Sequence, residues 1–288
     1  MGKRFDSLLF PGGKSKVFTL SYDDGVVQDR RLVPLFDEYG VKCTFNLGYG
    51  VLNYKVTEPP FPGTKFVDIS KVETHEVREL YRNHEVGGHG LYHSALPELG
   101  SPYAMYEILE DKVQLERLTG KPLKMFAYPF GLFNDDVKEY LRIAGYKGAR
   151  TVRSTYSFDL PEDPLQLDPT CHHKDERLME LAEQFVKMRA FKPSMFYVWG
   201  HGYEFDADDN WQVIEDLVRF MSEHGEDVWF ATNGEILSYL DAYNRLEYNV
   251  DGSAIYNPSA MDVQILTAFG RSELLKAGEY TLIGDTPL

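Results

Sequence analysis

Short β-rich runs alternate with longer amphipathic segments between residues 17 and 243. The β-rich runs predict seven strands, at 17–22, 42–47, 85–89, 124–130, 148–152, 195–200 and 228–233. The segments between them predict helices at 29–39, 74–83, 101–119, 174–190, 210–224 and 234–243, and a further helix that Asn134 opens. Strands that alternate with helices in this way pair in parallel through right-handed crossovers.

This alternation is compatible with a closed or incomplete α/β barrel and with an open doubly wound sheet, and we favour the barrel. From about Leu246 the pattern changes to short polar and apolar alternations, broken by the turn-forming stretches DG, NPS and KAGEY. We therefore expect a main domain at residues 1–244 and a small β-rich extension, packed on it, at residues 245–288.

The composition indicates a folded protein that binds neither nucleic acid nor membrane. Of the 288 residues, 43% are hydrophobic, which is enough to build a core. The formal net charge of −15 opposes binding to phosphate backbones and anionic membranes, because both require clustered lysine and arginine. No apolar stretch is long enough for a signal peptide or a transmembrane segment, so we expect a cytoplasmic protein. A chain from which an export signal had been removed would show the same pattern.

The two cysteines, Cys43 and Cys171, cannot form a disulfide framework. They are typical of reduced thiols in a reducing compartment. We expect neither of them to act as a nucleophile, and nothing in the sequence indicates the oligomeric state.

Two adjacent carboxylates, Asp23 and Asp24, stand in the stretch SYDDG at the end of the first predicted strand. Neighbouring strand residues point to opposite faces, but Gly25 can turn the backbone here. If both acids face one pocket, a bound cation would relieve their repulsion, and one would serve as ligand and the other as base. Taken alone, Asp-Asp-Gly is more typical of a turn or a helix cap than of a functional site.

Two histidines follow the third predicted strand, in the stretch GGHGLYHSA. His89 and His93 are four residues apart, a spacing that lets two imidazoles reach one ion. Together with a carboxylate they suit zinc or a similar divalent ion, although two loop histidines can also occur by chance. His84 precedes the strand, and we expect it to be structural.

His201 directly follows the strongly apolar predicted strand at 195–200. In an α/β barrel the active site lies at the carboxyl ends of the strands, whereas the opposite edge serves stability. The predicted strands place Asp23, Asp24, His89 and His93 at this same edge. One shared site explains this placement better than independent accidents.

Two further stretches are less decisive. FAYPFG, at 126–131, carries a Pro and a Gly at the end of the fourth predicted strand, and these form either a turn that ends the strand or part of the site. His172 and His173, in LDPTCHHKDE, either border the pocket or lie in an exposed loop, and the second interpretation is favoured.

Together these motifs resemble those of the polysaccharide deacetylases of carbohydrate esterase family 4, the NodB homology domain, over about residues 15 to 240. The resemblance implies a distorted, incomplete (β/α)7-type barrel. It also implies that Asp23 is the catalytic base, that Asp24, His89 and His93 bind the metal, and that His201 is the general acid. FAYPFG resembles the third motif of the family, in which the backbone N–H of Phe130 would stabilise an oxyanion.

The chain departs from the family pattern in two places. Where many members have an arginine in the third motif that orients the base, this chain has Ala127. A fourth motif with its Asp and Trp is missing near GARTV. We consider Arg150 and Arg153, on and after the next predicted strand, as sources of the missing charge.

The sequence therefore predicts a metal-dependent deacetylase or amidohydrolase that acts on non-peptide C–N bonds. Zinc is the expected cofactor, with cobalt, nickel or manganese as alternatives. The expected substrate is an acylated, most simply N-acetylated, sugar, from which water activated by the metal would remove the acyl group after losing a proton to Asp23. One alternative is hydrolysis of a small non-sugar amide or ureide, and another is a sugar-binding relative without catalytic activity.

Overall fold

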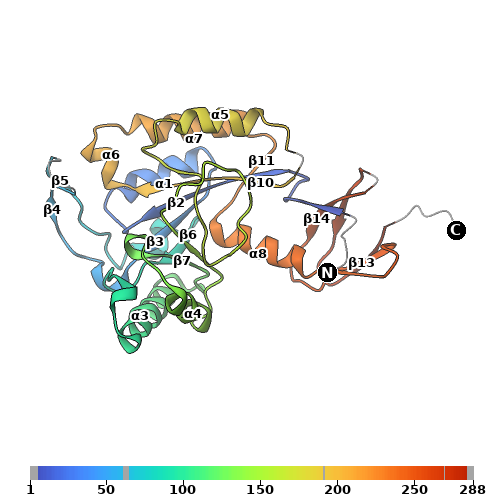
Figure 1. Ribbon diagram of the computed structural model, residues 1–288. Coiled ribbons are helices and arrows are strands. Elements are labelled where there is room, and N and C mark those ends of the chain that lie inside the picture. Colours follow the sequence, from blue (N-terminus) through green and yellow to red (C-terminus); the bar gives the residue numbers. More distant parts are fainter. Residues whose placement is uncertain (1–5, 61–64, 191, 269, 284–288) are drawn as a thin grey trace.

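The computed structural model describes residues 6–60, 65–190, 192–268 and 270–283, and a parallel sheet forms its centre (Figure 1). Seven of its strands follow the order β8-β7-β6-β3-β2-β10-β9, and β11 pairs with β2. Every pairing in this sheet is parallel. The strands are β2 (Lys16–Asp23), β3 (Cys43–Leu47), β6 (Glu85–Gly88), β7 (Met125–Ala127), β8 (Gly148–Arg150), β9 (Cys171–His172), β10 (Ser194–His201) and β11 (Val228–Phe230).

Strands β2 and β10 lie side by side in the middle of this sheet. All eight residues of β2 are buried, as expected for a strand covered on both faces. Its register with β10 runs from Ser194 opposite Lys16 to His201 opposite Asp23. The two strands therefore end at the same edge, with Asp23 and His201 as neighbours.

Helices cover the sheet on both sides (Figure 1). In the figure α5 and α7 run along one side and α3 and α4 along the other. Asn134 caps α4, because its side-chain oxygen accepts the N–H of Val137 at 2.9 Å, as the sequence predicted. The helices are α1 (Asp29–Glu38), α2 (Val77–Leu80), α3 (Ser101–Thr119), α4 (Asp135–Ile143), α5 (Leu178–Lys187), α6 (Tyr203–Ala207), α7 (Gln212–His224) and α8 (Asn233–Asn244). None of the helices in the described ranges combines the length and apolar character that a membrane span requires.

An antiparallel region follows α8 and includes the first described strand of the chain. Strands β1 (Asp6–Leu9), β14 (Val263–Thr267) and β15 (Ser272–Leu275) form one sheet, and β12 (Glu247–Tyr248), β13 (Ala254–Tyr256) and β16 (Tyr280–Leu282) form another. A second hydrophobic core, which includes Leu8, Ile236 and Ile265, joins this region to the barrel. The β-rich extension is thus confirmed up to residue 283, while the division at residues 244 and 245 stays a prediction. Residues 1–5 and 284–288 lie outside the described residues.

The predicted fold class is confirmed as an incomplete parallel (β/α) barrel. All seven predicted strands are present. The structure adds β9, whose two residues are too few to show a period, and α6, whose five residues follow His201. The helix predicted at 74–83 is reduced to the four residues of α2. A small antiparallel pair, β4 (Thr57–Glu58) and β5 (Val67–Asp68), lies outside the barrel sheet.

Both cysteines are free and buried. Burial raises the pKa of both thiols, that of Cys171 to about 12. His84 is also buried and accepts the backbone N–H of Cys43 at 3.3 Å, which is a structural role.

Asp29, the first residue of α1, is a buried acid that should make stability depend on pH. Burial raises its pKa to about 8, although the Tyr81 hydroxyl donates a hydrogen bond to it at 2.6 Å. A pKa raised in the folded state gives stability that is present at low pH and is lost as pH rises toward 8. Through Asp29 the free energy of unfolding should fall by about 1.4 kcal/mol per pH unit in this range, and Asp29→Asn should abolish this fall. Urea unfolding at pH 5 and pH 8 measures it, and equal pH slopes for variant and wild type would contradict the assignment.

Candidate active site

Asp23 and Asp24 face the same space because the backbone reverses between them. Asp23 is the last residue of β2, and Asp24 has a φ of 79°, in the left-handed region. Gly25 follows with a φ of 56°, and a Cβ there would lie 2.6 Å from Leu47 Cδ2. The expected turn is therefore present, and it is already made at Asp24.

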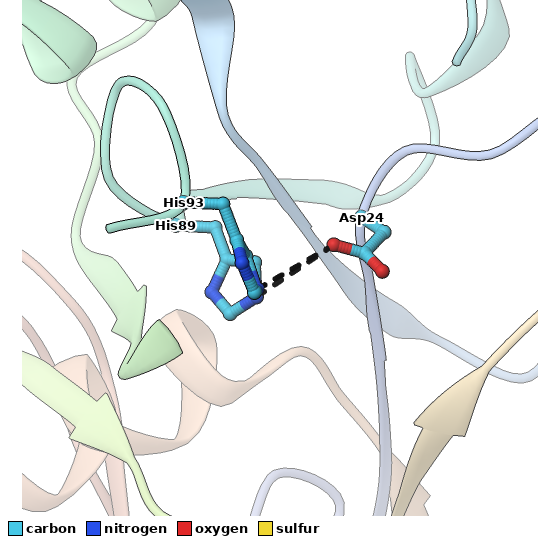
Figure 2. Close-up of side chains that lie close together, drawn as sticks. All are labelled: Asp24, His89 and His93. Atoms are coloured by element: carbon cyan, nitrogen blue, oxygen red, sulfur yellow. Dashed lines mark ion pairs between the residues drawn. The ribbon is translucent and has the colours of Figure 1, made fainter. Parts of the chain in front are cut away.

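The three predicted metal ligands come together at the carboxyl end of the sheet (Figure 2). His89 follows β6 directly, and His93 lies in the loop after it. Their Nε2 atoms are 4.0 Å and 3.7 Å from Asp24 Oδ1. Figure 2 shows both imidazoles pointing from this loop toward the carboxylate of Asp24. We call Asp24, His89 and His93 the ligand triad.

Hydrogen bonds fix the orientation of His89. Its Nδ1 lies 2.8 Å from the carbonyl oxygen of Ala127, so this nitrogen donates and Nε2 presents its lone pair to Asp24. The buried carboxylate of Asp111 accepts the backbone N–H of His89 at 3.1 Å. Both contacts hold the imidazole before any ligand binds.

Left-handed backbone is concentrated at this site. Of the six described non-glycine residues with positive φ, three are Asp24, His93 and Phe130. Such conformations cost on the order of 1–3 kcal/mol each and occur mainly where function requires them. Phe130 lies in the short helical turn Pro129–Gly131, and its ring packs edge-on against His93 with centroids 4.5 Å apart.

Asp23 is held from two sides. Asn46 donates to its Oδ1 at 2.9 Å, and the Arg150 guanidinium pairs with its Oδ2. Arg150 is the last residue of β8, four places from β2 in the sheet order, so the pair spans the curved interior of the half-barrel. The same guanidinium lies over the ring of Trp199, 4.3 Å from its centroid.

Arg150 thus supplies the positive charge that many family members have at the position of Ala127. The two residues are opposite each other in the register of β7 and β8, so the arginine stands one strand away from the family position. Arg153, the other candidate, is exposed and pairs with Asp168. The structure therefore selects Arg150.

The charges around the site set its protonation states. Burial alone would raise the pKa of Asp23, but Arg150, His89 and His201 hold this pKa below its ordinary value. Lys71 and the histidines likewise outweigh burial and lower the pKa of Asp24 strongly. Burial lowers the pKa of His89 to about 4. At neutral pH the site therefore offers two carboxylates and a neutral imidazole.

His201 ends β10 and faces Asp23, with its Nε2 3.9 Å from Asp23 Oδ2. Its Nδ1 lies 3.2 Å from Oε2 of Glu204, a buried residue of α6. Burial would lower the pKa of His201, but this hydrogen bond and the nearby aspartates raise it.

The favoured placement of His172 and His173 in an exposed loop is wrong. His173 is 1% exposed, and its ring stacks on Phe205 at 4.2 Å. His172 lies beside it, with its Nε2 3.1 Å from Glu204 Oε2. Strand β9 pairs with β10 and brings both histidines behind His201. The two-residue strand gave no periodic signal in the sequence.

The ligand triad fits a divalent cation. Its donor atoms all lie within 4.8 Å of one another, and the Nε2–Oδ1 distances are 4.0 Å and 3.7 Å. Two donors that are each about 2.1 Å from a tetrahedral ion lie roughly 3.4 Å apart, so small side-chain movements would let both histidines bind together with Asp24. Two imidazoles and a carboxylate with one side open are typical of catalytic zinc sites.

A model of the family described as polysaccharide deacetylase matches residues 11–149. The matched segment contains both aspartates, the ligand triad and Phe130. This part of the chain, just under half of its length, is thus similar to the polysaccharide deacetylase family. Arg150, His201 and Glu204 lie beyond the matched segment. No curated protein matches the sequence.

One of the similar solved structures supports the fold. A Mycobacterium smegmatis protein assigned to the polysaccharide deacetylases aligns with a TM-score of 0.57 at 15% identity, over 83% of this chain and 94% of that one. The deacetylase PplD of Streptococcus pyogenes, in complex with acetate, aligns at 0.44 and 18% identity, over 51% of this chain and 61% of that one. A family 4 carbohydrate esterase pseudoenzyme of Bacillus anthracis aligns at 0.47 and 18% identity, over 80% and 68%. The chain thus spans less than two thirds of the Streptococcus pyogenes protein.

Proposed function

We propose that this protein is a metal-dependent deacetylase that releases acetate from an N-acetylated amino sugar. One arrangement carries the proposal: Asp23 Oδ2 lies 3.9 Å from both His89 Nε2 and His201 Nε2. In this position Asp23, beside the proposed ligand His89, can take a proton from the attacking water. His201 can give a proton to the leaving nitrogen on the other side of the bond that breaks.

The residues of the chain divide the chemistry as follows. Asp24, His89 and His93 would hold the cation, zinc first, with cobalt, nickel and manganese as alternatives. When bound, the cation supplies Lewis-acid activation of the amide carbonyl and of water. Asp23, kept ionised by Arg150, accepts a proton from the attacking water. The backbone N–H of Phe130 stabilises the negative charge that develops on the carbonyl oxygen. His201 gives the departing nitrogen a proton as the C–N bond breaks.

Exposed aromatic rings beside the ligand triad favour a sugar over a small amide or ureide. The side chains of Tyr92 and Phe130 are more than half exposed, at 53% and 62%. Tyr92 directly precedes His93, and Phe130 contacts it. Flat apolar rings at the edge of a site can stack on the apolar faces of sugar rings. Hydrolysis of a small amide or ureide would give these rings no such role.

The metal assignment predicts a loss of binding in Asp24→Ala. Removing one of three protein ligands should weaken Zn²⁺ binding by at least about tenfold. Equilibrium dialysis against Zn²⁺, followed by metal analysis, measures this directly and needs no activity. Asp216→Ala, at a partly exposed aspartate on α7, is the matched control and should bind metal as the wild type does. Unchanged binding in Asp24→Ala would refute the site.

A further inference from the structure

Several nitrogen atoms lie within hydrogen-bonding distance of one carboxylate oxygen of Glu204. Its side chain is buried, and Oε2 accepts the backbone N–H of His201 at 3.0 Å. The same oxygen lies 3.2 Å from His201 Nδ1 and 3.1 Å from His172 Nε2. His173 Nε2 is 3.4 Å away. We call these four residues the Glu204 cluster.

The hydrogen positions in the cluster follow from its contacts. An ionised carboxylate only accepts, so Nδ1 of His201 carries a hydrogen. His172 Nδ1 accepts the backbone N–H of Lys174 at 3.1 Å, so His172 donates to Glu204 through Nε2. His201 Nε2 is then the nitrogen that faces Asp23.

The back of the cluster is tightly packed. A Cβ at Gly200 would lie 2.0 Å from His173 Nδ1, so only glycine lets the imidazole approach β10 so closely. The Tyr22 hydroxyl lies 3.2 Å from the same nitrogen. This packing fixes the position of His173, whose Nε2 lies against Glu204.

We infer that Glu204 is the positioning residue of His201 in this chain, which lacks the fourth motif of its family. It holds the imidazole by backbone and side chain, with Nε2 toward the reacting bond. Because Nδ1 of His201 carries a hydrogen, Nε2 has a proton to give only in the imidazolium form. The negative charge of Glu204 stabilises this imidazolium. The inference rests on the proposed function. As the C–N bond breaks, this proton moves to the departing nitrogen, and the acyl carbon keeps the oxygen of water as acetate.

The test compares two leaving groups in Glu204→Gln. Glutamine keeps the shape and an accepting oxygen but removes the charge. An N-acetylated amino sugar needs a proton on its leaving nitrogen, whereas 4-nitrophenolate leaves 4-nitrophenyl acetate without one. With Zn²⁺-loaded protein, kcat/KM for the amide should fall about 10- to 100-fold. For the ester it should change by less than about threefold. His201→Ala should show the same selectivity with a larger loss.

Glu85→Gln is the matched control, because Glu85 is a partly buried glutamate at the opposite edge of the sheet that accepts the N–H of Gly234. Glu85→Gln should change kcat/KM for the amide and for the ester by the same factor. Equal losses on amide and ester in Glu204→Gln would overturn the inference, as would an unchanged amide rate. Two zinc ions per wild-type chain and one in Glu204→Gln would assign the cluster to a second cation and also overturn it. A wild type that releases acetate from neither substrate would refute the proposed function, and the role of Glu204 with it.

Discussion

Asp23→Asn is expected to lower kcat roughly 10²- to 10⁴-fold while the ligand triad still binds metal. Asparagine can keep the hydrogen bond to Asn46 by turning its amide, but it cannot accept a proton from water. The loss should therefore appear in kcat at every pH from 5 to 9, with KM little changed. Steady-state acetate release and metal analysis on the same preparation measure both parts.

The contrast with Asp24→Ala makes this result specific. Both variants should be inactive, but only Asp24→Ala should lose metal, because Asp23 is not assigned to the triad. Activity retained in Asp23→Asn would remove Asp23 as the base. Loss of metal from Asp23→Asn would instead make it a ligand.

Arg150→Met is expected to have the second largest effect, on both stability and rate. It leaves the carboxylate of Asp23 buried without its partner, which should lower the free energy of unfolding by about 3–5 kcal/mol. Burial would then raise the pKa of Asp23, so kcat/KM should fall about 10²-fold at pH 7 and recover in part as pH rises. Urea unfolding and a pH profile of acetate release measure the two effects.

The register of β7 and β8 offers a rescue of this variant. Ala127 is opposite Arg150, so the double change Ala127→Arg with Arg150→Ala moves the charge to the position where many family members have it. This double variant should regain at least about tenfold over the single change. Arg153→Met, which removes the pair between the exposed Arg153 and Asp168, should stay within about twofold of the wild type. A loss in Arg153→Met as large as in Arg150→Met would contradict the assignment.

The order of strands and helices could be predicted because each central strand is a continuous apolar run bounded by polar residues. β2 and β10 are buried along almost their whole length, and His201, Asp23 and His89 lie at or directly after strand ends. In a parallel sheet the carboxyl ends share one edge, so the order alone places these side chains together. The proximity of Asp24, His89 and His93 therefore followed from the sequence.

The partners of Asp23 and His201 could not be predicted in the same way. Arg150 reaches Asp23 only because the sheet curves, and sequence spacing says nothing about curvature. Glu204 was missed because it follows the last strand-end motif, although His201 and Glu204 at i and i+3 are a local signal that could have indicated it. The burial of His172 and His173 depends on β9, a strand two residues long.

Acetate release by the zinc-loaded wild-type protein tests the central claim most directly. N-acetylated amino-sugar oligomers would be compared with small acylamides and ureides, with Asp23→Asn as the blank. The account predicts acetate and free amino groups from the oligomers, at a rate at least about 10²-fold above the blank. Metal-loaded protein that releases acetate from none of the sugars, or that hydrolyses only the small amides and ureides, would contradict it.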